Sequence, residues 1–587
     1  MRTISSLLLL AACTAKPDDT LSCGAGTHED GGTCVADADT DADTDADTDA
    51  DTDADTDADT DADTDADTDA DTDADPDADA DGFPVSQDCD DTDATVNPDG
   101  TEVCGNGADD DCDGSPGTCG WSGDNRLPSG AWELTGDRSG DYSASGLAIG
   151  GDIDGDGIGD LLVGAQYSAR AGDGAGLVYV VRGPVSADGD LADAEATLLG
   201  SGGQAAYAGQ TVEFLGDLDG DGFDDFGVSA PGAGPDSTSG RDGAAYVVHG
   251  PVSGEADLAD VAYTWAGFGG NATGSDLAAG GDLDGDGADD LVIGARGDGS
   301  YVEDGGAAFV VFGPADRDGD LSSADVRVYG NPGGNGCSRE YLGSSVAGLG
   351  DVNGDGQDDL GIAGSRYCNA DNGDEDLGAV HVFFGPVSGS LLSDDDDARI
   401  VGDLDIQSYW LGAVPSGLAS AGDVDGDGVD DVVVGNSSAH AGVAQYTGAA
   451  YVVTGSALTG TVDVLFAGWT LEGTSAYSEL GYAVSGIGDE DGDGFADVLV
   501  GAPSDDEYGD GAGAAYLFRG PLSGSDVPAD ADATFYGADR SWGTGTAIAG
   551  GGDATGDGWP DFVIGTPEKT GGASYSGSAF VFTGGGF

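Results

Sequence analysis

From about residue 140 onward, short apolar runs alternate with Gly- and Asp-rich turns at a regular interval. In the first unit the apolar runs are Gly146–Gly150, Leu161–Ala165, Gly176–Val181 and Ala196–Gly200. Short runs rich in Val, Leu and Ile and bounded by Gly or Pro are typical of β-strands. The pattern therefore predicts four strands per unit in an all-β region.

One Asp-rich motif marks each unit and recurs seven times. Its first copy runs from Asp152 to Asp160, and the later copies begin at nearly even intervals, at Asp217, Asp282, Asp351, Asp423, Asp489 and Asp553. Self-similarity at such a nearly constant interval indicates a repeat architecture, here with one blade per unit. The seventh unit stops after its third strand, whereas Ala131–Gly136 has the pattern of a fourth strand. We therefore predict that Ala131–Gly136 pairs with the last blade and closes a ring.

The repeats resemble the FG-GAP repeats of integrin α-subunits. The GAP element reads Ser229-Ala-Pro231, Gly294-Ala-Arg296, Gly501-Ala-Pro503 and Gly565-Thr-Pro567, while the phenylalanine of the FG element is mostly replaced. The resemblance covers about residues 130–587. It implies that residues 121–587 form a seven-bladed β-propeller, which makes the expected fold class all-β.

The Asp motif resembles a calcium-binding loop. Asp at positions one, three, five and nine can reach one point if the backbone turns sharply, and Gly at position six allows that turn. Position seven would offer its carbonyl oxygen. An EF-hand fits less well, because it needs Glu at position twelve and a following helix, whereas an apolar strand follows here. The remaining alternative is a plain Asp-Gly turn without metal.

The expected ligands in copies one to four are Asp152, Asp154, Asp156, Ile158 and Asp160; Asp217, Asp219, Asp221, Phe223 and Asp225; Asp282, Asp284, Asp286, Ala288 and Asp290; and Asp351, Asn353, Asp355, Gln357 and Asp359. Those in copies five to seven are Asp423, Asp425, Asp427, Val429 and Asp431; Asp489, Asp491, Asp493, Phe495 and Asp497; and Asp553, Thr555, Asp557, Trp559 and Asp561. Up to seven Ca²⁺ ions are thus expected, with affinities of about 10⁻⁴–10⁻³ M. Asn353 and Thr555 replace a carboxylate, so binding by copies four and seven is left open.

The N-terminus has the features of an export signal. Residues 1–12 combine Arg2 with a short apolar run that ends Leu10-Ala-Ala-Cys13. This ending resembles the bacterial lipobox, which implies a lipoprotein signal peptide, lipidation of Cys13 and a place at the outer membrane or cell surface. The alternative is an ordinary secretory signal.

Two segments follow the expected anchor. Residues 13–36 form a small loop that a Cys23–Cys34 disulfide would close. Residues 37–81 carry Asp at every odd position and, apart from Pro76, no apolar residue larger than Ala. Such a segment cannot bury a core, so we expect a disordered spacer; a low-affinity calcium buffer is the alternative.

Residues 82–120 are rich in Cys and Asp and resemble a metal-binding motif found in many bacterial surface proteins. Asp88, Asp90 and Asp93 would converge on one further Ca²⁺ in the stretch 88–114, because hard oxygen ligands suit this ion. The stretch lacks the His and Met ligands of a copper site. The alternative is a disulfide knot whose aspartates face water.

Eight cysteines besides Cys13 predict disulfides in an exported protein. The pairing among the four central ones is open, and a Cys337–Cys368 bridge would join two loops of one propeller face. The expected disulfide cysteines are Cys23, Cys34, Cys89, Cys104, Cys112, Cys119, Cys337 and Cys368.

The formal net charge of −98 excludes binding to nucleic acid, because a polyanion repels phosphate groups. It also excludes electrostatic binding to an anionic membrane, so we expect membrane attachment only through the lipid. The face opposite the calcium loops would present aromatic side chains that could bind a protein or glycan ligand or pack between blades: Tyr142, Tyr207, Tyr341, Tyr409, Trp410, Tyr477 and Trp542. The sequence contains no nucleophile elbow of the kind found in serine hydrolases. The positions of His249 and His381 near the ends of third strands indicate structural roles. We therefore expect a non-catalytic, calcium-binding adhesion or ligand-binding module. The alternative is an extracellular hydrolase or lyase acting on polysaccharide or phospholipid.

Overall fold

The computed structural model describes two parts of the chain, which form separate units. Near the N-terminus, β1 (Thr27–Asp30) pairs with β2 (Thr33–Ala36) in an antiparallel hairpin. The other described residues are 83, 89, 96–98, 112 and 120–585 without 201–204, 235–241, 269, 332–338, 367–377, 403–410, 413, 415–416, 441–444, 467 and 571–573.

Within residues 120–585 the described strands form seven five-stranded sheets, the blades I to VII of a propeller. The innermost strand of each blade contacts the innermost strands of both neighbours, and blade VII contacts blade I. The predicted all-β, seven-bladed propeller is therefore confirmed.

From the inner to the outer strand, blades I to IV consist of β5 (Gly146–Ile149), β6 (Leu161–Gly164), β7 (Leu177–Val181), β9 (Ala196–Leu199) and β13 (Gly254–Asp257); β10 (Val212–Gly216), β11 (Asp225–Ala230), β12 (Ala244–Val248), β14 (Tyr263–Ala266) and β18 (Gly319–Asp320); β15 (Leu277–Gly281), β16 (Asp290–Ala295), β17 (Ala307–Val311), β19 (Val326–Tyr329) and β23 (Gly389–Leu392); and β20 (Leu342–Gly348), β21 (Leu360–Gly364), β22 (Ala379–Phe383), β24 (Ala398–Val401) and β28 (Gly460–Asp463).

Blades V to VII consist of β25 (Leu418–Gly422), β26 (Asp431–Asn436), β27 (Ala449–Val453), β29 (Trp469–Glu472) and β33 (Gly524–Asp526); β30 (Val484–Gly488), β31 (Asp497–Ala502), β32 (Ala514–Phe518), β34 (Ala533–Tyr536) and β3 (Gly123–Arg126); and β35 (Ile548–Gly552), β36 (Asp561–Gly565), β37 (Ser578–Phe582), β4 (Trp132–Thr135) and β8 (Gly189–Asp190). Short helical turns lie between third and fourth strands: η1 (Leu191–Asp193), α1 (Leu258–Val261), η2 (Leu321–Ser323), η3 (Ser393–Asp395), η4 (Gly455–Ala457), η5 (Val464–Phe466) and η6 (Pro528–Asp530).

The fifth strand of each blade differs from the predicted four-stranded unit. It comes from the segment before the fourth strand of the next blade and pairs in parallel with the fourth strand of the blade before it, as β13 does with β9. It covers an outer edge whose backbone groups would otherwise lack strand partners. Neighbouring blades are thereby joined by main-chain hydrogen bonds as well as by side chains.

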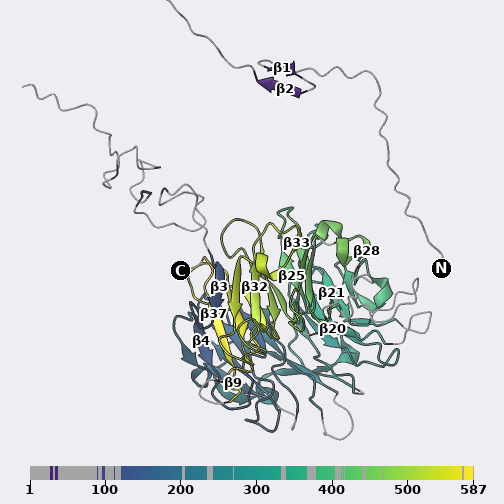
Figure 1. Cartoon of the computed structure of the whole chain (residues 1–587). Helices are drawn as coiled ribbons and strands as arrows, with labels where there is room; N and C mark the ends of the chain where they lie inside the picture. Colours follow the sequence, from purple (N-terminus) through teal and green to yellow (C-terminus); the bar gives the residue numbers. More distant parts are fainter. Residues whose placement is uncertain are drawn as a thin grey trace, which may run out of the picture. The chain divides into compact units, whose positions relative to one another are not determined.

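Two strands from the start of the propeller close the ring. As predicted, β4 pairs with β37 in antiparallel register, with Leu134 opposite Ala579. The preceding strand β3 adds to blade VI, with Asn125 opposite Phe535. Figure 1 shows β4, coloured blue, beside the yellow β37, although the two strands come from opposite ends of the propeller sequence.

Trp121 fastens the beginning of this closure segment. Its ring, only 8% exposed, lies 5.7 Å from the ring of Phe535 and 5.1 Å from that of Phe582. Its indole Nε1–H donates to the Thr583 carbonyl oxygen at 2.8 Å, and its backbone N–H donates to Glu490 at 3.0 Å. The Trp121 side chain therefore ties β3 to blades VI and VII.

The core lies between blades rather than within a single central cluster. Each of seven apolar clusters combines residues of two consecutive blades; one contains Leu134 and Val581 of blade VII together with Leu161 and Tyr179 of blade I. Every blade therefore depends on both neighbours for burial of its apolar faces.

A charged network is buried in blade IV. The His381 side chain is fully buried, with Nδ1 2.8 Å from Asp396 Oδ2 and Nε2 2.8 Å from Glu340 Oε1. Arg399 Nε lies 2.6 Å from Asp396 Oδ2. Burial disfavours a charged imidazole, but the two carboxylates outweigh burial and raise the pKa of His381 to about 9.

The stability of a His381→Gln variant should fall less between pH 7 and pH 10 than that of the natural protein. Because the pKa of His381 is higher in the folded than in the unfolded state, the protonated imidazole stabilises the fold at low pH. That contribution disappears as the pH rises through about 9. Urea unfolding at pH 7, 8, 9 and 10 measures the effect, with His440→Gln as the control. Parallel pH profiles for the natural protein and His381→Gln would contradict the prediction.

Candidate functional site

The Asp loops connect the first and second strands of the blades, and blade III illustrates their geometry. Both carboxylate oxygens of Asp282 accept backbone N–H groups, those of positions four, five and six, at 2.8–2.9 Å. Asp284 and Asp286 each accept the N–H two residues further on at 3.0 Å. The loop thereby folds around its own carboxylates.

The carboxylate at position nine is buried in all seven loops. In blade III, Asp290 accepts the Leu283 N–H at 2.9 Å and the Gly313 N–H at 3.0 Å, so it joins the loop to the end of the third strand. Burial raises the pKa of these seven carboxyl groups, to about 6 at Asp160 and to about 8 at Asp497. A bound cation would offset the unfavourable burial of this charge.

Carboxylates predicted to bind calcium come together in at least four of the described loops. In each of blades I, II, III and V, one oxygen from each of three carboxylates lies within 4.8 Å of the others; the sets are Asp152, Asp154 and Asp160; Asp217, Asp219 and Asp221; Asp282, Asp284 and Asp286; and Asp423, Asp425 and Asp431. Such groups of hard oxygen atoms suit Ca²⁺.

The loops differ in what position three contacts. Arg182 Nε lies 3.1 Å from Asp154 Oδ2 in blade I, and Arg519 Nε lies 3.3 Å from Asp491 Oδ2 in blade VI. In the two copies without an acid at this position, the side chains donate to the position-nine carboxylate instead; these are Asn353 at 3.2 Å and Thr555 at 3.3 Å. Loops III and V keep all four carboxylates, and their third strands are followed by the uncharged Phe312 and Thr454.

Replacing Asp284 or Asp425 by Asn should weaken calcium binding at its loop about tenfold, because affinity falls with the number of ligand charges. Equilibrium dialysis would show the loss of one of the tighter sites in each variant. Asp193→Asn changes the same charge at an exposed position outside the loops and serves as the control. Equal affinities in the control and both loop variants would contradict the prediction.

Position eight links successive loops, which the motif alone did not reveal. The Asp152 N–H donates to Asp224 of the next blade at 2.7 Å, the Asp282 N–H to Asp358 at 2.8 Å, and the Asp351 N–H to Asp430 at 3.1 Å. A cation that fixes one loop would therefore also stabilise the contact with the next blade.

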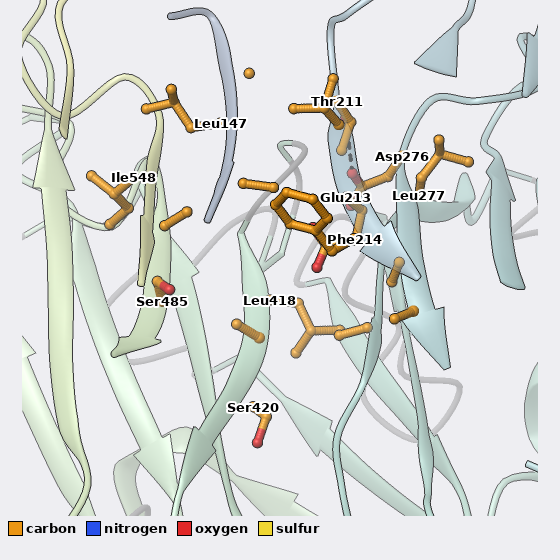
Figure 2. A pocket seen from close by; sticks show the side chains of 18 of the residues that line it. Leu147, Thr211, Glu213, Phe214, Asp276, Leu277, Leu418, Ser420, Ser485 and Ile548 are labelled. Atoms are coloured by element: carbon orange, nitrogen blue, oxygen red, sulfur yellow. Dashed lines mark hydrogen bonds between the residues drawn. The ribbon is translucent and has the colours of Figure 1, made fainter. Parts of the chain in front are cut away.

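The inner strands enclose a cavity of about 270 Å³ along the centre of the ring (Figure 2). Asp276 accepts from Thr211 Oγ1 at 3.1 Å and from Ser345 Oγ at 2.8 Å. Burial, together with the charge of Asp276, raises the pKa of Glu213 to about 8. The carboxyl groups of the cavity thus lie among apolar side chains such as Phe214.

The propeller face opposite the Asp loops carries the loops between second and third strands and the crossovers between blades. These two sets of segments meet in parallel bridges such as Gly176 with Ala208. Directly before such bridges, Tyr142, Tyr207 and Tyr341 have left-handed backbones with φ of 52–56°. A non-Gly residue in the left-handed conformation costs about 1 kcal/mol, and such strained residues cluster at functional sites. These three tyrosines are therefore candidates for a functional role.

Four tyrosines of blades VII, I and II form a continuous aromatic cluster on this face. Tyr142 stacks on Tyr575 at 5.4 Å and meets Tyr167 edge-on at 5.3 Å, and Tyr167 meets Tyr207 at 5.7 Å. Tyr167 and Tyr575 are 47% and 42% exposed. Tyr142, Tyr167 and Tyr207 line a pocket of about 670 Å³ that also contains Gln166 and Glu568. We call this pocket the tyrosine pocket.

The other predicted positions have mixed outcomes. Tyr477 is 56% exposed. Trp542 is buried, and its ring stacks on Phe580 and lies 4.6 Å from Lys569 Nζ. Trp542 therefore packs between blades VI and VII. A disulfide joins Cys89 to Cys112, which resolves one pairing left open above. The remaining predictions at Cys13, Cys23, Asp88, Asp90, Asp93, Cys104, Cys119, Cys337, Cys368, Tyr409 and Trp410 lie outside the described residues, as does the Cys34 side chain.

Comparison with known families places these loops and strands in context. The FG-GAP repeat family matches residues 143–181, 415–453 and 480–518, each of which contains one Asp loop and the strands around it. The propeller is built of FG-GAP repeats. A second family, described as "Putative metal-binding motif", matches residues 88–116.

Relatives of the FG-GAP propeller include integrin α-subunits and a phospholipase. The chain is 31% identical over 158 residues to integrin alpha-5 of Xenopus laevis, which is 25% of this chain and 14% of that protein. For integrin alpha-4 of the same organism it is 33% over 167 residues, or 28% and 15%. For human phosphatidylinositol-glycan-specific phospholipase D it is 30% over 238 residues, or 38% and 25%. The chain thus matches a quarter or less of each of these relatives.

Among solved structures, the exotype rhamnogalacturonan lyase YesX aligns with 77% of this chain and 76% of its own, at 12% identity and a TM-score of 0.37.

The integrin-like repeats point to an extracellular or surface protein with a ligand-binding propeller and suggest metal binding. Among the described residues, no helix is long and apolar enough to span a bilayer.

Proposed function

We propose that this protein is a calcium-binding, lipid-anchored module of the bacterial cell surface or outer membrane that binds a protein or glycan ligand through its tyrosine pocket. Calcium would occupy the Asp loops on one face. The ligand would bind on the other face, and the lipid on Cys13 would hold the module at the membrane.

The observation that carries this proposal is the gathering of tyrosine rings around a pocket, two of them on residues with left-handed backbones. The volume of about 670 Å³ falls within the usual range for small-ligand sites. Tyrosine rings offer apolar faces with a hydroxyl at the tip, and Gln166, Asp173 and Glu568 add hydrogen-bonding groups. This combination suits a sugar ring or an amphipathic protein side chain.

The calcium part of the proposal draws on the converging carboxylates. In loop III, three carboxylate oxygens lie within 4.8 Å of one another, and a fourth carboxylate, Asp290, is buried close by. Without a cation these like charges repel each other. Since the loops hydrogen-bond to neighbouring blades, calcium would stabilise the arrangement that shapes the opposite face.

The test is a glycan array and a protein pull-down with the full chain in calcium, each repeated in chelator. Tyr167→Ala should lower the affinity for any captured ligand at least tenfold. Tyr301→Ala is the matched control, because Tyr301 is 55% exposed in a second-to-third-strand loop of blade III but does not line the tyrosine pocket. Equal loss in both variants would contradict the assignment of the pocket.

The same experiment separates binding from catalysis. We propose a non-catalytic role, and saturable binding without product formation would support it. Turnover of a captured polysaccharide or of a phospholipid would instead support the hydrolase or lyase alternative. The likeness to a phospholipase D is a reason to test this alternative.

A further inference from the structure

The residue that follows the third strand decides what lies above each Asp loop. It directly precedes the backbone N–H that donates to the position-nine carboxylate, as Gly250 does to Asp225 at 3.0 Å. From blade I to blade VII this residue is Arg182, His249, Phe312, Phe384, Thr454, Arg519 and Thr583. Blade II alone places an imidazole there.

The imidazole of His249 lies among the carboxylates of its loop. Nδ1 is 2.8 Å from Asp219 Oδ2, and Nε2 is 3.8 Å from Asp225 Oδ2. One ligand atom from each of Asp219, Asp225 and His249 falls within 4.8 Å of the other two. The cluster thus combines two carboxylate oxygens with one ring nitrogen.

A second observation shows that His249 is not satisfied by the described part of the protein. Its Nε2 atom is buried and has no hydrogen-bond partner among the described residues. Asp225 is completely buried, and the ring of Tyr263 lies 5.1 Å from the imidazole. A buried nitrogen without a partner beside a buried carboxylate is unfavourable unless a further group binds there.

We propose that the loop of blade II is a site for a divalent transition ion such as Zn²⁺ or Co²⁺, with Asp219, Asp225 and His249 as ligands. Imidazole nitrogen suits these ions, whereas Ca²⁺ prefers six to eight oxygen ligands. The arginines at the same place in blades I and VI cannot act as ligands, because a guanidinium has no acceptor atom. Blade II therefore differs in metal preference from the calcium loops of the proposed function.

Cobalt is the probe, because nitrogen and oxygen ligation changes its visible absorption. The full chain, equilibrated with Co²⁺, is dialysed against millimolar Ca²⁺, which removes Co²⁺ from sites made only of carboxylates. We expect one equivalent of Co²⁺ to remain. His249→Phe, which installs the residue of blade III, should lower Co²⁺ affinity at least tenfold, whereas His440→Phe should leave it unchanged.

A gain of binding provides the second variant. Phe312→His places an imidazole above Asp284 and Asp290, the counterparts of Asp219 and Asp225, and should add a second equivalent of retained Co²⁺. This result does not depend on the folding of His249→Phe. Removal of all Co²⁺ by Ca²⁺, or equal retention by the natural protein and His249→Phe, would overturn the inference.

The inference rests on the proposed function only in that both use Asp loops, and their failures can be told apart. Calcium binding at the other loops without retained Co²⁺ overturns the transition-ion site alone. Retained Co²⁺ in a protein that binds no calcium overturns the calcium part of the proposed function alone.

Discussion

Calcium should raise the melting temperature of the full chain by roughly 4 °C relative to chelator. Calcium at ten times its dissociation constant stabilises the folded state by about 1.4 kcal/mol per occupied site. The converging carboxylates of the loops in blades I, III and V would together contribute about 4 kcal/mol, and a large domain shows a smaller temperature shift per kcal/mol than a small one. Scanning calorimetry in calcium and in EDTA measures the shift.

This experiment needs a control for general charge screening, because the chain has a net charge of −98 and any salt weakens its self-repulsion. Sodium chloride at matched ionic strength provides that control. A combined Asp284→Asn and Asp425→Asn variant should show a smaller calcium shift than the natural protein. The same midpoint in calcium and in EDTA would show that the loops do not couple calcium to folding.

Replacing Trp121 by Ala should destabilise the propeller by about 3–5 kcal/mol, the usual effect of deleting a buried large aromatic side chain. The change removes two edge-to-face ring contacts, with Phe535 and Phe582, and the hydrogen bond to Thr583. It also loosens the segment that closes the ring. Denaturant unfolding monitored by circular dichroism gives the free energy of unfolding.

Phe466→Ala is the control for Trp121, because Phe466 is 78% exposed and its truncation should change the free energy of unfolding by less than about 0.5 kcal/mol. A loss below about 1 kcal/mol in Trp121→Ala would mean that Trp121 does not secure the closure. A loss as large in Phe466→Ala would point to a general effect of removing aromatic side chains.

The number of blades and their first four strands could be predicted from the sequence, because the strand and turn signals repeat together with the Asp loop. The sequence also predicted the pairing of Ala131–Gly136 with the last blade. The fifth strands escaped prediction because segments such as Gly189–Asp190 and Gly319–Asp320 are very short and lack apolar alternation. What defines them is a parallel partner in another blade, which local pattern does not encode.

The Asp loops could be predicted because all the ligands of one loop lie within a single short motif. The differences among them could not, since Arg182 and His249 follow the third strands of their blades, far along the chain from Asp154 and Asp219. Only the strand register brings these side chains above the loop. The sequence favours a structural role for His249, because this residue lies near the end of a third strand and directly before a Gly. Tyr167 and Tyr575 were missed because they lie in variable loops that carry no periodic signal.

The order of strands at the beginning of the propeller has a mechanical consequence. The polypeptide enters the ring through β3 and then β4, the outermost strand of blade VI and the fourth strand of blade VII. Tension along the chain that precedes Trp121 would therefore be borne first by the contacts of Trp121 with Glu490 and Thr583 and then by the bonds between β3 and β34. If those bonds ruptured, the load would pass to β4, and the ring would open at this seam while the other blades kept their own strands.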